Sequence, residues 1–95
     1  MREEELQSLI VSVLHEGQTL SGREWTDLGP DSKPVGDLDG FDSLSAVETT
    51  VAIEQRLGCK LEVESIFVSE DGKRALTLKE ICASVSKLVT KGRTK

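Results

Sequence analysis

Apolar residues of this chain recur at the three- and four-residue spacing of an α-helix in three separate segments, and no segment alternates as a half-buried strand does. The last segment is the clearest. Thr77 and Glu80 have the spacing of a capping box, which satisfies backbone N–H groups at the start of a helix. An unbroken apolar stripe follows, formed by Leu78, Ile81, Cys82, Val85, Leu88 and Val89. We therefore expect an all-α fold whose last helix spans about residues 77–90.

The first helix is predicted at about residues 3–15. Its apolar face consists of Leu6, Leu9, Ile10 and Val13. Three glutamates at residues 3–5 suit the positive end of the helix dipole. At the other end His15 suits the negative end of the dipole, and Gly17 is expected to close the helix as its C-cap.

Residues 16–42 are expected to form one long loop, because glycines and prolines interrupt every periodic pattern there. So long a stretch without secondary structure needs apolar anchors. Trp25 and Leu28 are the candidates. Packing of Trp25 into the core is the preferred interpretation, and a Trp25 that faces a partner is the alternative.

The second helix is predicted at about residues 43–57, with Gly58 after its end. It carries two apolar stripes, with Glu54 between them. One stripe consists of Ala46, Thr50, Ile53 and Leu57, and the other of Leu44, Val47 and Val51. A single buried face does not normally place a carboxylate at its centre. We therefore expect the first stripe to pack into the core and the second to remain partly exposed.

A short third helix is predicted at about residues 62–67, which include Ile66 and Phe67, with a turn at residues 69–73. The expected architecture is a four-helix bundle in one domain of residues 1–95. It has a long loop between the first two helices and a short third helix.

Size and charge favour a carrier, an adaptor or a binding module over an enzyme. A chain of 95 residues buries one compact core and leaves no room for a deep active-site cleft. The net charge is −5, and residues 1–72 alone carry about −11. Such an acidic body repels nucleic acid and attracts partners with basic patches.

The sequence also argues against several sites and compartments. Cys59, Cys82 and the single His15 lack the spacing and number of a zinc site. The N-terminus is acidic, without the apolar run of a signal peptide, and no stretch has transmembrane length. A cytoplasmic location and no membrane insertion are the expectations.

The segment from Asp37 to Glu48 partly matches two known motifs. Asp37, Asp39 and Glu48 have the spacing of three EF-hand calcium ligands, but Phe41 occupies a ligand position and Asp42 the position of the required glycine. The DxDG sequence of residues 37–40 is similar to a phosphatase nucleophile motif. That motif follows an apolar strand in a much larger α/β domain. Both interpretations are rejected, and no metal site is predicted.

A third interpretation places an exposed serine at the head of the second helix. Either Asp42 or Ser43 can cap that helix, and taken alone Asp42-Ser43-Leu44 is an ordinary cap. A phosphate on Ser43 would, however, meet unpaired backbone N–H groups and the positive end of the dipole. The second apolar stripe starts beside this serine, with Glu48 at its border.

With these features the sequence resembles the acyl carrier protein family. The resemblance rests on Asp37-Leu38, a short spacer that contains Gly40, and Asp42-Ser43-Leu44 at the start of the second helix. It continues to Leu57 and Leu61, and again in the final helix.

The resemblance implies a non-catalytic carrier protein that acts as a monomer. A phosphopantetheinyl transferase would use coenzyme A and magnesium to attach 4'-phosphopantetheine to Ser43, flanked by Asp42 and Leu44. The arm would carry acyl groups as thioesters to acyl-transferring or acyl-activating enzymes of fatty-acid, lipid or polyketide-type biosynthesis. Residues expected to dock these partners are Leu44, Val47, Glu48, Val51 and Glu54.

Three departures from the family pattern indicate a specialised member and not the housekeeping fatty-acid carrier. The loop that contains Trp25 is long, the segment of residues 68–76 is expanded, and Ser45 and Arg56 replace acids of the second helix. An aminoacyl or peptidyl carrier, or a helical adaptor that does not use the serine, remains the alternative.

Overall fold

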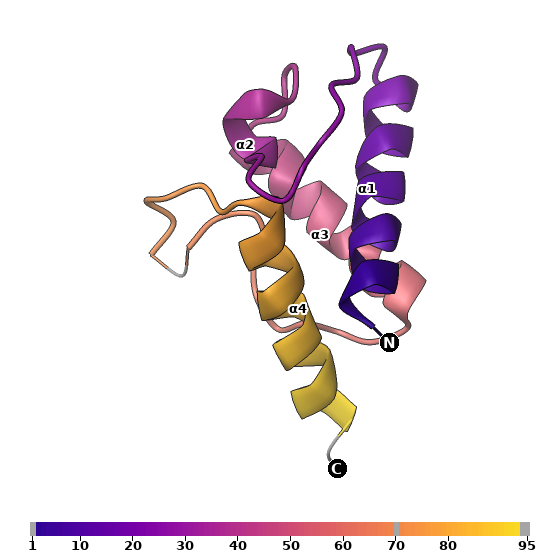
Figure 1. Cartoon of the computed structure of the whole chain (residues 1–95), viewed down its shortest axis with the longest axis vertical. Coiled ribbons are helices and arrows are strands. Elements are labelled where there is room, and N and C mark those ends of the chain that lie inside the picture. Colours follow the sequence, from indigo (N-terminus) through magenta and orange to yellow (C-terminus); the bar gives the residue numbers. More distant parts are fainter. Residues whose placement is uncertain (1, 70, 94–95) are drawn as a thin grey trace.

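The computed structural model describes residues 2–69 and 71–93, the last four by their backbone alone. It contains the helices α1 (Glu3–Leu20), α2 (Pro34–Asp37), α3 (Ser43–Leu57) and α4 (Leu78–Arg93) (Figure 1). The described residues form no strand beyond one isolated antiparallel bridge between Val68 and Ala75. The predicted all-α class is confirmed, and α3 has the bounds expected from the sequence.

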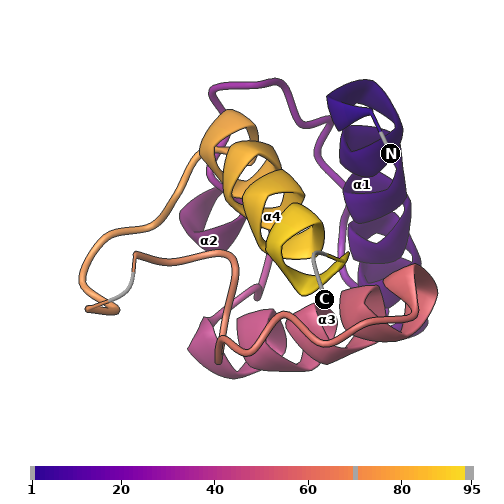
Figure 2. The same ribbon diagram turned by 90° about the horizontal axis from the view of Figure 1, so that it is seen from below.

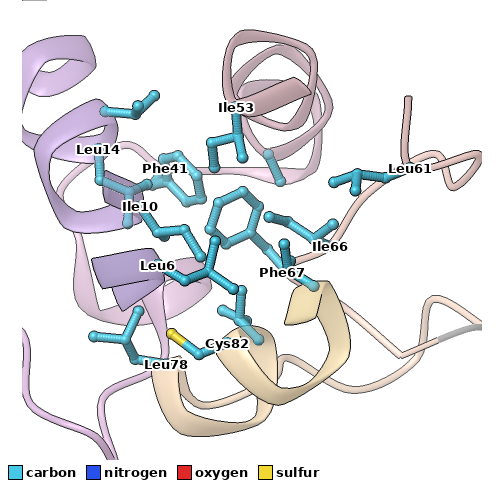
Figure 3. Close-up of a cluster of buried hydrophobic side chains, with 14 of the residues drawn as sticks. Leu6, Ile10, Leu14, Phe41, Ile53, Leu61, Ile66, Phe67, Leu78 and Cys82 are labelled. Atoms are coloured by element: carbon cyan, nitrogen blue, oxygen red, sulfur yellow. The ribbon is translucent and has the colours of Figure 1, made fainter. Parts of the chain in front are cut away.

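The core lies where α1, α3 and α4 meet, with α1 in contact with both other helices. Phe67 is fully buried among side chains from all three (Figure 3). Its ring meets that of Phe41 edge to face, with centroids 5.3 Å apart. Each large apolar side chain buried in this way stabilises the fold by about 1.5–3 kcal/mol.

Helix α1 continues five residues beyond the predicted end at residue 15, so the C-cap prediction for Gly17 is wrong. Gln18 explains the extension. Its side chain is only 2% exposed, and its Nε2 donates to the carbonyls of Glu24 (3.2 Å) and Asp39 (2.8 Å). These bonds tie the last turn of α1 to the loop that follows.

His15 therefore lies inside α1 and not at its end. It is exposed, and its ring meets that of Trp25 edge-on at 4.7 Å. Trp25 is half-buried against the core, and its indole N–H donates to the Asp27 carboxylate at 3.2 Å. Packing onto the body of the protein is thus the interpretation of Trp25 that the structure supports.

The short helix predicted at residues 62–67 does not form. Side chains of α3 hold this segment in an irregular conformation by accepting its backbone N–H groups. The Leu61 N–H donates to Glu54 Oε2 at 2.8 Å, and the Ile66 N–H donates to the buried Thr50 hydroxyl at 3.1 Å. The short helix of this fold is instead α2, a single turn that begins at Pro34. It lies within the segment predicted to be a loop.

The loop of residues 16–42 is also anchored to the start of α4. The Leu78 and Lys79 N–H groups donate to the carbonyls of Ser32 (2.8 Å) and Pro30 (2.9 Å). The capping box is present, because the Thr77 N–H donates to Glu80 Oε1 at 2.9 Å and the Glu80 N–H donates to Thr77 Oγ1 at 3.2 Å. The first turn of α4 is thereby held from two sides.

Cys82 belongs to the core, and burial raises the pKa of its thiol to about 11. The described residues contain no group of three or more His, Cys, Asp or Glu side chains suited to a metal ion. None of the described helices is long and apolar enough to span a membrane.

Candidate functional site

Ser43 is the first residue of α3, and its side chain is exposed. The residue before it, Asp42, is the N-cap. Asp42 Oδ1 accepts the Ser45 N–H at 2.9 Å, and its carbonyl accepts the Ala46 N–H at 2.9 Å. The sequence left open whether Asp42 or Ser43 caps this helix, and the structure assigns the cap to Asp42. The Ser43 hydroxyl has no hydrogen-bond partner within residues 2–69 and 71–93.

The pKa of the Asp42 carboxyl lies below its ordinary value. The main cause is the hydrogen bond from the Ser45 backbone N–H, followed by the Ser45 side chain and then by the positive charge of Arg23. Asp42 is therefore ionised at neutral pH, and its negative charge lies at the positive end of the α3 dipole.

Arg23 is not among the residues predicted from the sequence, yet it lies at the head of α3. Its Nη1 donates to Ser45 Oγ at 3.2 Å, and its backbone N–H donates to the Gln18 carbonyl at 2.8 Å. Gly40 makes room for this side chain, because a Cβ at Gly40 would lie 2.8 Å from Arg23 Nε. No local sequence pattern predicts that Arg23 lies at this site, because its contact with Ser45 joins residues that are 22 positions apart.

The two predicted stripes of α3 have the expected exposures. Ala46, Thr50 and Ile53 are buried, whereas Leu44 is 68% and Val51 47% exposed. Val47 is half-buried, and Glu48 is exposed. These side chains give α3 an outward face, defined here by Leu44, Val47, Glu48 and Val51.

Glu54, the fifth residue predicted to dock partners, differs from the other four. It is half-buried, and its carboxylate accepts the Leu61 N–H. This bond explains why a carboxylate lies between the two apolar stripes, because Glu54 holds the chain that leaves α3.

A groove of about 640 Å³ opens beside Ser43, between α3, α4 and the segment that connects them. In Figure 2 this segment first follows α3 and then bulges away near the N-terminal end of α3 before it reaches α4. The groove is lined by Ser43, Val47, Val63, Glu64, Ser65, Ile66, Val68, Ser69, Gly72, Leu76, Ser84 and Leu88. A smaller groove of about 240 Å³ lies between α1 and α3 and includes Arg23 and Ser45.

The head of α3 is suited to a covalently attached phosphate. The exposed Ser43 hydroxyl can be esterified without the loss of an internal hydrogen bond. Helix starts carry backbone N–H groups without intrahelical partners, and they favour negative charge. Asp42 takes only the Ser45 N–H as a side-chain cap, so the turn keeps donors for an anion.

A protein-family model described as "phosphopantetheine attachment site" matches residues 4–70 of the chain. This range includes α2, α3 and all of α1 except its first residue, and it ends before α4. No curated protein and no solved structure matched the chain.

Proposed function

The chain belongs to the phosphopantetheine-attachment family, whose members carry a covalent 4'-phosphopantetheine, and we propose on this basis that it is an acyl carrier that bears the arm on Ser43. One observation carries the assignment to this residue. Ser43 is an exposed hydroxyl without a hydrogen-bond partner in the described chain, at the head of a long helix that its neighbour Asp42 already caps.

In this proposal a phosphopantetheinyl transferase moves the phosphopantetheine group of coenzyme A, with magnesium, to the Ser43 hydroxyl. The thiol at the end of the arm then carries acyl groups as thioesters. The protein performs no catalysis. It supplies a tether that raises the effective concentration of its cargo at each partner enzyme.

The outward face of α3 is the proposed docking surface. Its apolar residues, Leu44, Val47 and Val51, lie along the helix that begins at Ser43, and Glu48 adds a negative charge. A partner with an apolar patch and basic residues around it fits this face. Glu54 contributes to this surface indirectly, because its carboxylate accepts the Leu61 N–H and holds the segment after α3 against the helix.

The family's usual acidic character is weaker on the side of α3 that faces α1. Arg23 lies at the head of the helix, and Arg56 near its end pairs with Glu16 of α1 at 2.9 Å. This distribution favours the approach of basic partner surfaces from the side of the larger groove, away from Arg23 and Arg56. The partners in this proposal are acyl-transferring or acyl-activating enzymes. The weaker acidic character of this side of α3 also supports a specialised role. We further propose that the protein acts in the cytoplasm and as a monomer.

The test is intact-mass measurement after incubation with coenzyme A, magnesium and a broad-specificity transferase. We expect the wild type to gain one phosphopantetheine and Ser43→Ala to gain none. Ser45→Ala, which keeps the attachment serine and removes a hydroxyl two residues away, is the matched control and should gain the full mass. An unmodified wild type, or an undiminished gain on Ser43→Ala, contradicts the proposal.

A helical adaptor would behave differently in the same samples. Its partner binding would be indifferent to Ser43→Ala and would be weakened by Val47→Asp or Val51→Asp.

A further inference from the structure

Arg23 is held beside the first turn of α3 by contacts on three sides. Its backbone N–H donates to the Gln18 carbonyl at 2.8 Å, and its Nη1 donates to Ser45 Oγ at 3.2 Å. Its side chain passes over Gly40, where a Cβ would lie 2.8 Å from Arg23 Nε. The half-buried guanidinium therefore has a defined position at the head of the helix.

Arg23 lacks a direct counter-ion, because no carboxylate lies within ion-pair distance of it in the part of the chain that the structure describes. The pKa of the Asp42 carboxyl is lowered mainly by the hydrogen bond from the Ser45 N–H and to a smaller extent by the charge of Arg23. Asp42 thus lies nearby, but it bonds the backbone of α3 and not the guanidinium. Ser45 is a neutral partner, which orients the guanidinium and leaves its positive charge in place.

The guanidinium of Arg23 also keeps hydrogen-bond donors for a further partner. It has several N–H groups, and among the described residues only Ser45 accepts one of them. A carboxylate can take two parallel hydrogen bonds from such a group. The side chain lines the smaller groove between α1 and α3, so it can be reached from that side.

An enzyme that takes hold of Ser43 must also cover Arg23. Ser43 and Ser45 belong to the same helical turn, which rises only about 5 Å along the helix axis. A protein interface of ordinary size covers about 800 Å² on each partner, more than one turn presents. Arg23 therefore lies within the footprint of a partner at the head of α3.

We propose that Arg23 is a specificity-determining residue, which forms an ion pair with a carboxylate side chain of the partner enzyme beside Ser43 and disfavours enzymes that present a basic residue at that point. The inference rests on the attachment to Ser43 proposed above. Opposite charges across an interface speed association, and like charges exclude a wrong partner. The acidic body of the chain attracts basic surfaces in general, whereas Arg23 selects among them at one position.

A carboxylate of a protein partner fits Arg23 better than the phosphate of the arm does. Ser43 lines the larger groove, whereas Arg23 and Ser45 line the smaller one. Residues two positions apart point to nearly opposite sides of a helix. A phosphate on Ser43 is therefore directed away from the guanidinium.

The experiment measures kcat/KM for loading by a transferase that has a basic carrier-binding surface. Arg23→Gln should be loaded about two- to fivefold faster than the wild type, as for loss of one exposed charge contact. Arg23→Lys keeps the charge and should stay close to the wild type. Ser45→Glu places a carboxylate beside the guanidinium, so it should give the same gain as Arg23→Gln with Arg23 in place. These gains should shrink as salt screens the charges.

Lys60→Gln is the matched control, because Lys60 is exposed and follows the other end of α3. It loses the same charge about 20 Å from the head of the helix, beyond the screening length, and should load as the wild type does.

The second arm reverses charges on the transferase, with its basic surface residues changed singly to Glu. We expect one of these enzymes to load the wild type faster than Arg23→Gln, because its new carboxylate meets Arg23.

Equal loading of the wild type, Arg23→Gln and Ser45→Glu overturns the inference, and so does an equal gain in Lys60→Gln or Arg23→Lys. The absence of any reversed preference among the transferase variants overturns the ion pair with a partner carboxylate. In all these outcomes the wild type still gains the mass of the arm. A wild type that gains no mass at Ser43 contradicts the proposed function instead.

Discussion

Asp42 Oδ1 accepts the Ser45 backbone N–H at 2.9 Å, so the capping of α3 is performed by the residue before the serine. Capping of the helix and esterification would compete for one serine hydroxyl, and here they fall to two different residues. The Asp42 carboxylate completes the helix, and the Ser43 hydroxyl stays available for esterification. We therefore expect the head of the helix to remain formed whether or not Ser43 is modified.

Removal of the Asp42 cap and removal of the proposed attachment hydroxyl of Ser43 should have different effects on stability. Asp42→Ala should lower the urea midpoint of unfolding, because it leaves the Ser45 N–H without its acceptor. Ser43→Ala should change the free energy of unfolding by no more than about 0.5 kcal/mol, as is usual for an exposed side chain. Asp42→Asn keeps a capping oxygen and should remain close to the wild type. A larger loss in Ser43→Ala than in Asp42→Ala would show that the serine is the cap.

Glu80 should make stability depend on acid. In the folded protein the pKa of the Glu80 carboxyl is lowered from 4.5 to about 2. The main cause is the hydrogen bond from Arg74, and the next is the hydrogen bond from the Thr77 N–H. A carboxyl whose pKa is depressed by folding contributes stability that is complete above its ordinary pKa and is lost as the pH falls through the folded value. The contribution of Glu80 is thus present above pH 4.5 and lost toward pH 2.

Urea unfolding between pH 2 and pH 6 measures this contribution. Glu80→Gln keeps the capping-box geometry but loses the charge, so its stability should be below that of the wild type at pH 6 and approach it at the acid end. Glu62→Gln is the control, because Glu62 is exposed and no hydrogen bond of its carboxylate is found in the described chain. A constant difference between wild type and Glu80→Gln across the range would contradict the assignment.

Gly40→Ala should destabilise the protein by about 1–2 kcal/mol or more, because Gly40 has a φ of +65° and its Cβ would lie 2.8 Å from Arg23 Nε. Combination with Arg23→Ala should recover the part of the lost stability that is due to the close contact and leave the part that is due to the positive φ of the backbone.

Gly17→Ala is the contrasting change. Gly17 lies inside α1 with nothing within 4 Å of its added Cβ, so the substitution should stabilise the helix by up to about 1 kcal/mol. Chemical denaturation of Gly40→Ala, Arg23→Ala, the double variant and Gly17→Ala measures all these differences.

Thr50 should prove to be the buried link between α3 and the irregular segment after it. Its hydroxyl donates to the Ala46 carbonyl at 2.8 Å and accepts the Ile66 N–H at 3.1 Å. Thr50→Val removes that acceptor, so a buried N–H loses its partner at a cost of about 1–3 kcal/mol. Hydrogen exchange at the Ile66 amide should accelerate in Thr50→Val and stay slow in Thr50→Ser, which retains the hydroxyl. Unchanged exchange in Thr50→Val would show that another group holds this amide.

Substitution on the outward face of α3 should weaken partner binding without unfolding the protein. Leu44→Asp and Val51→Asp change side chains that are 68% and 47% exposed, so the free energy of unfolding should change little. If this face docks the transferase, kcat/KM for loading should fall about fivefold or more, as for interface residues worth over ~1 kcal/mol. Leu20→Asp, on an 82% exposed residue of α1, is the control and should load normally. Equal kinetics for all three variants would place the docking surface elsewhere.

The contrast between α3 and the segment after it shows which features could be predicted. The bounds of α3, its two stripes and the Thr77–Glu80 capping box all follow from residues within one or two turns of each other. The predicted helix at residues 62–67 has plausible local composition, but Glu54 and Thr50 take the backbone donors of Leu61 and Ile66.

The amino-acid sequence by itself determined the helical class, the position of Ser43 at the head of α3 and the surplus apolar stripe beside it, because periodicity and capping are local properties of the chain. Only the tertiary structure decided that α1 extends to Leu20, that Arg23 reaches Ser45 and that Ser84 faces the groove beside Ser43. Each of these depends on a contact between residues far apart in the chain. The partner in such a contact is selected by packing and hydrogen-bond satisfaction, which no local spacing encodes.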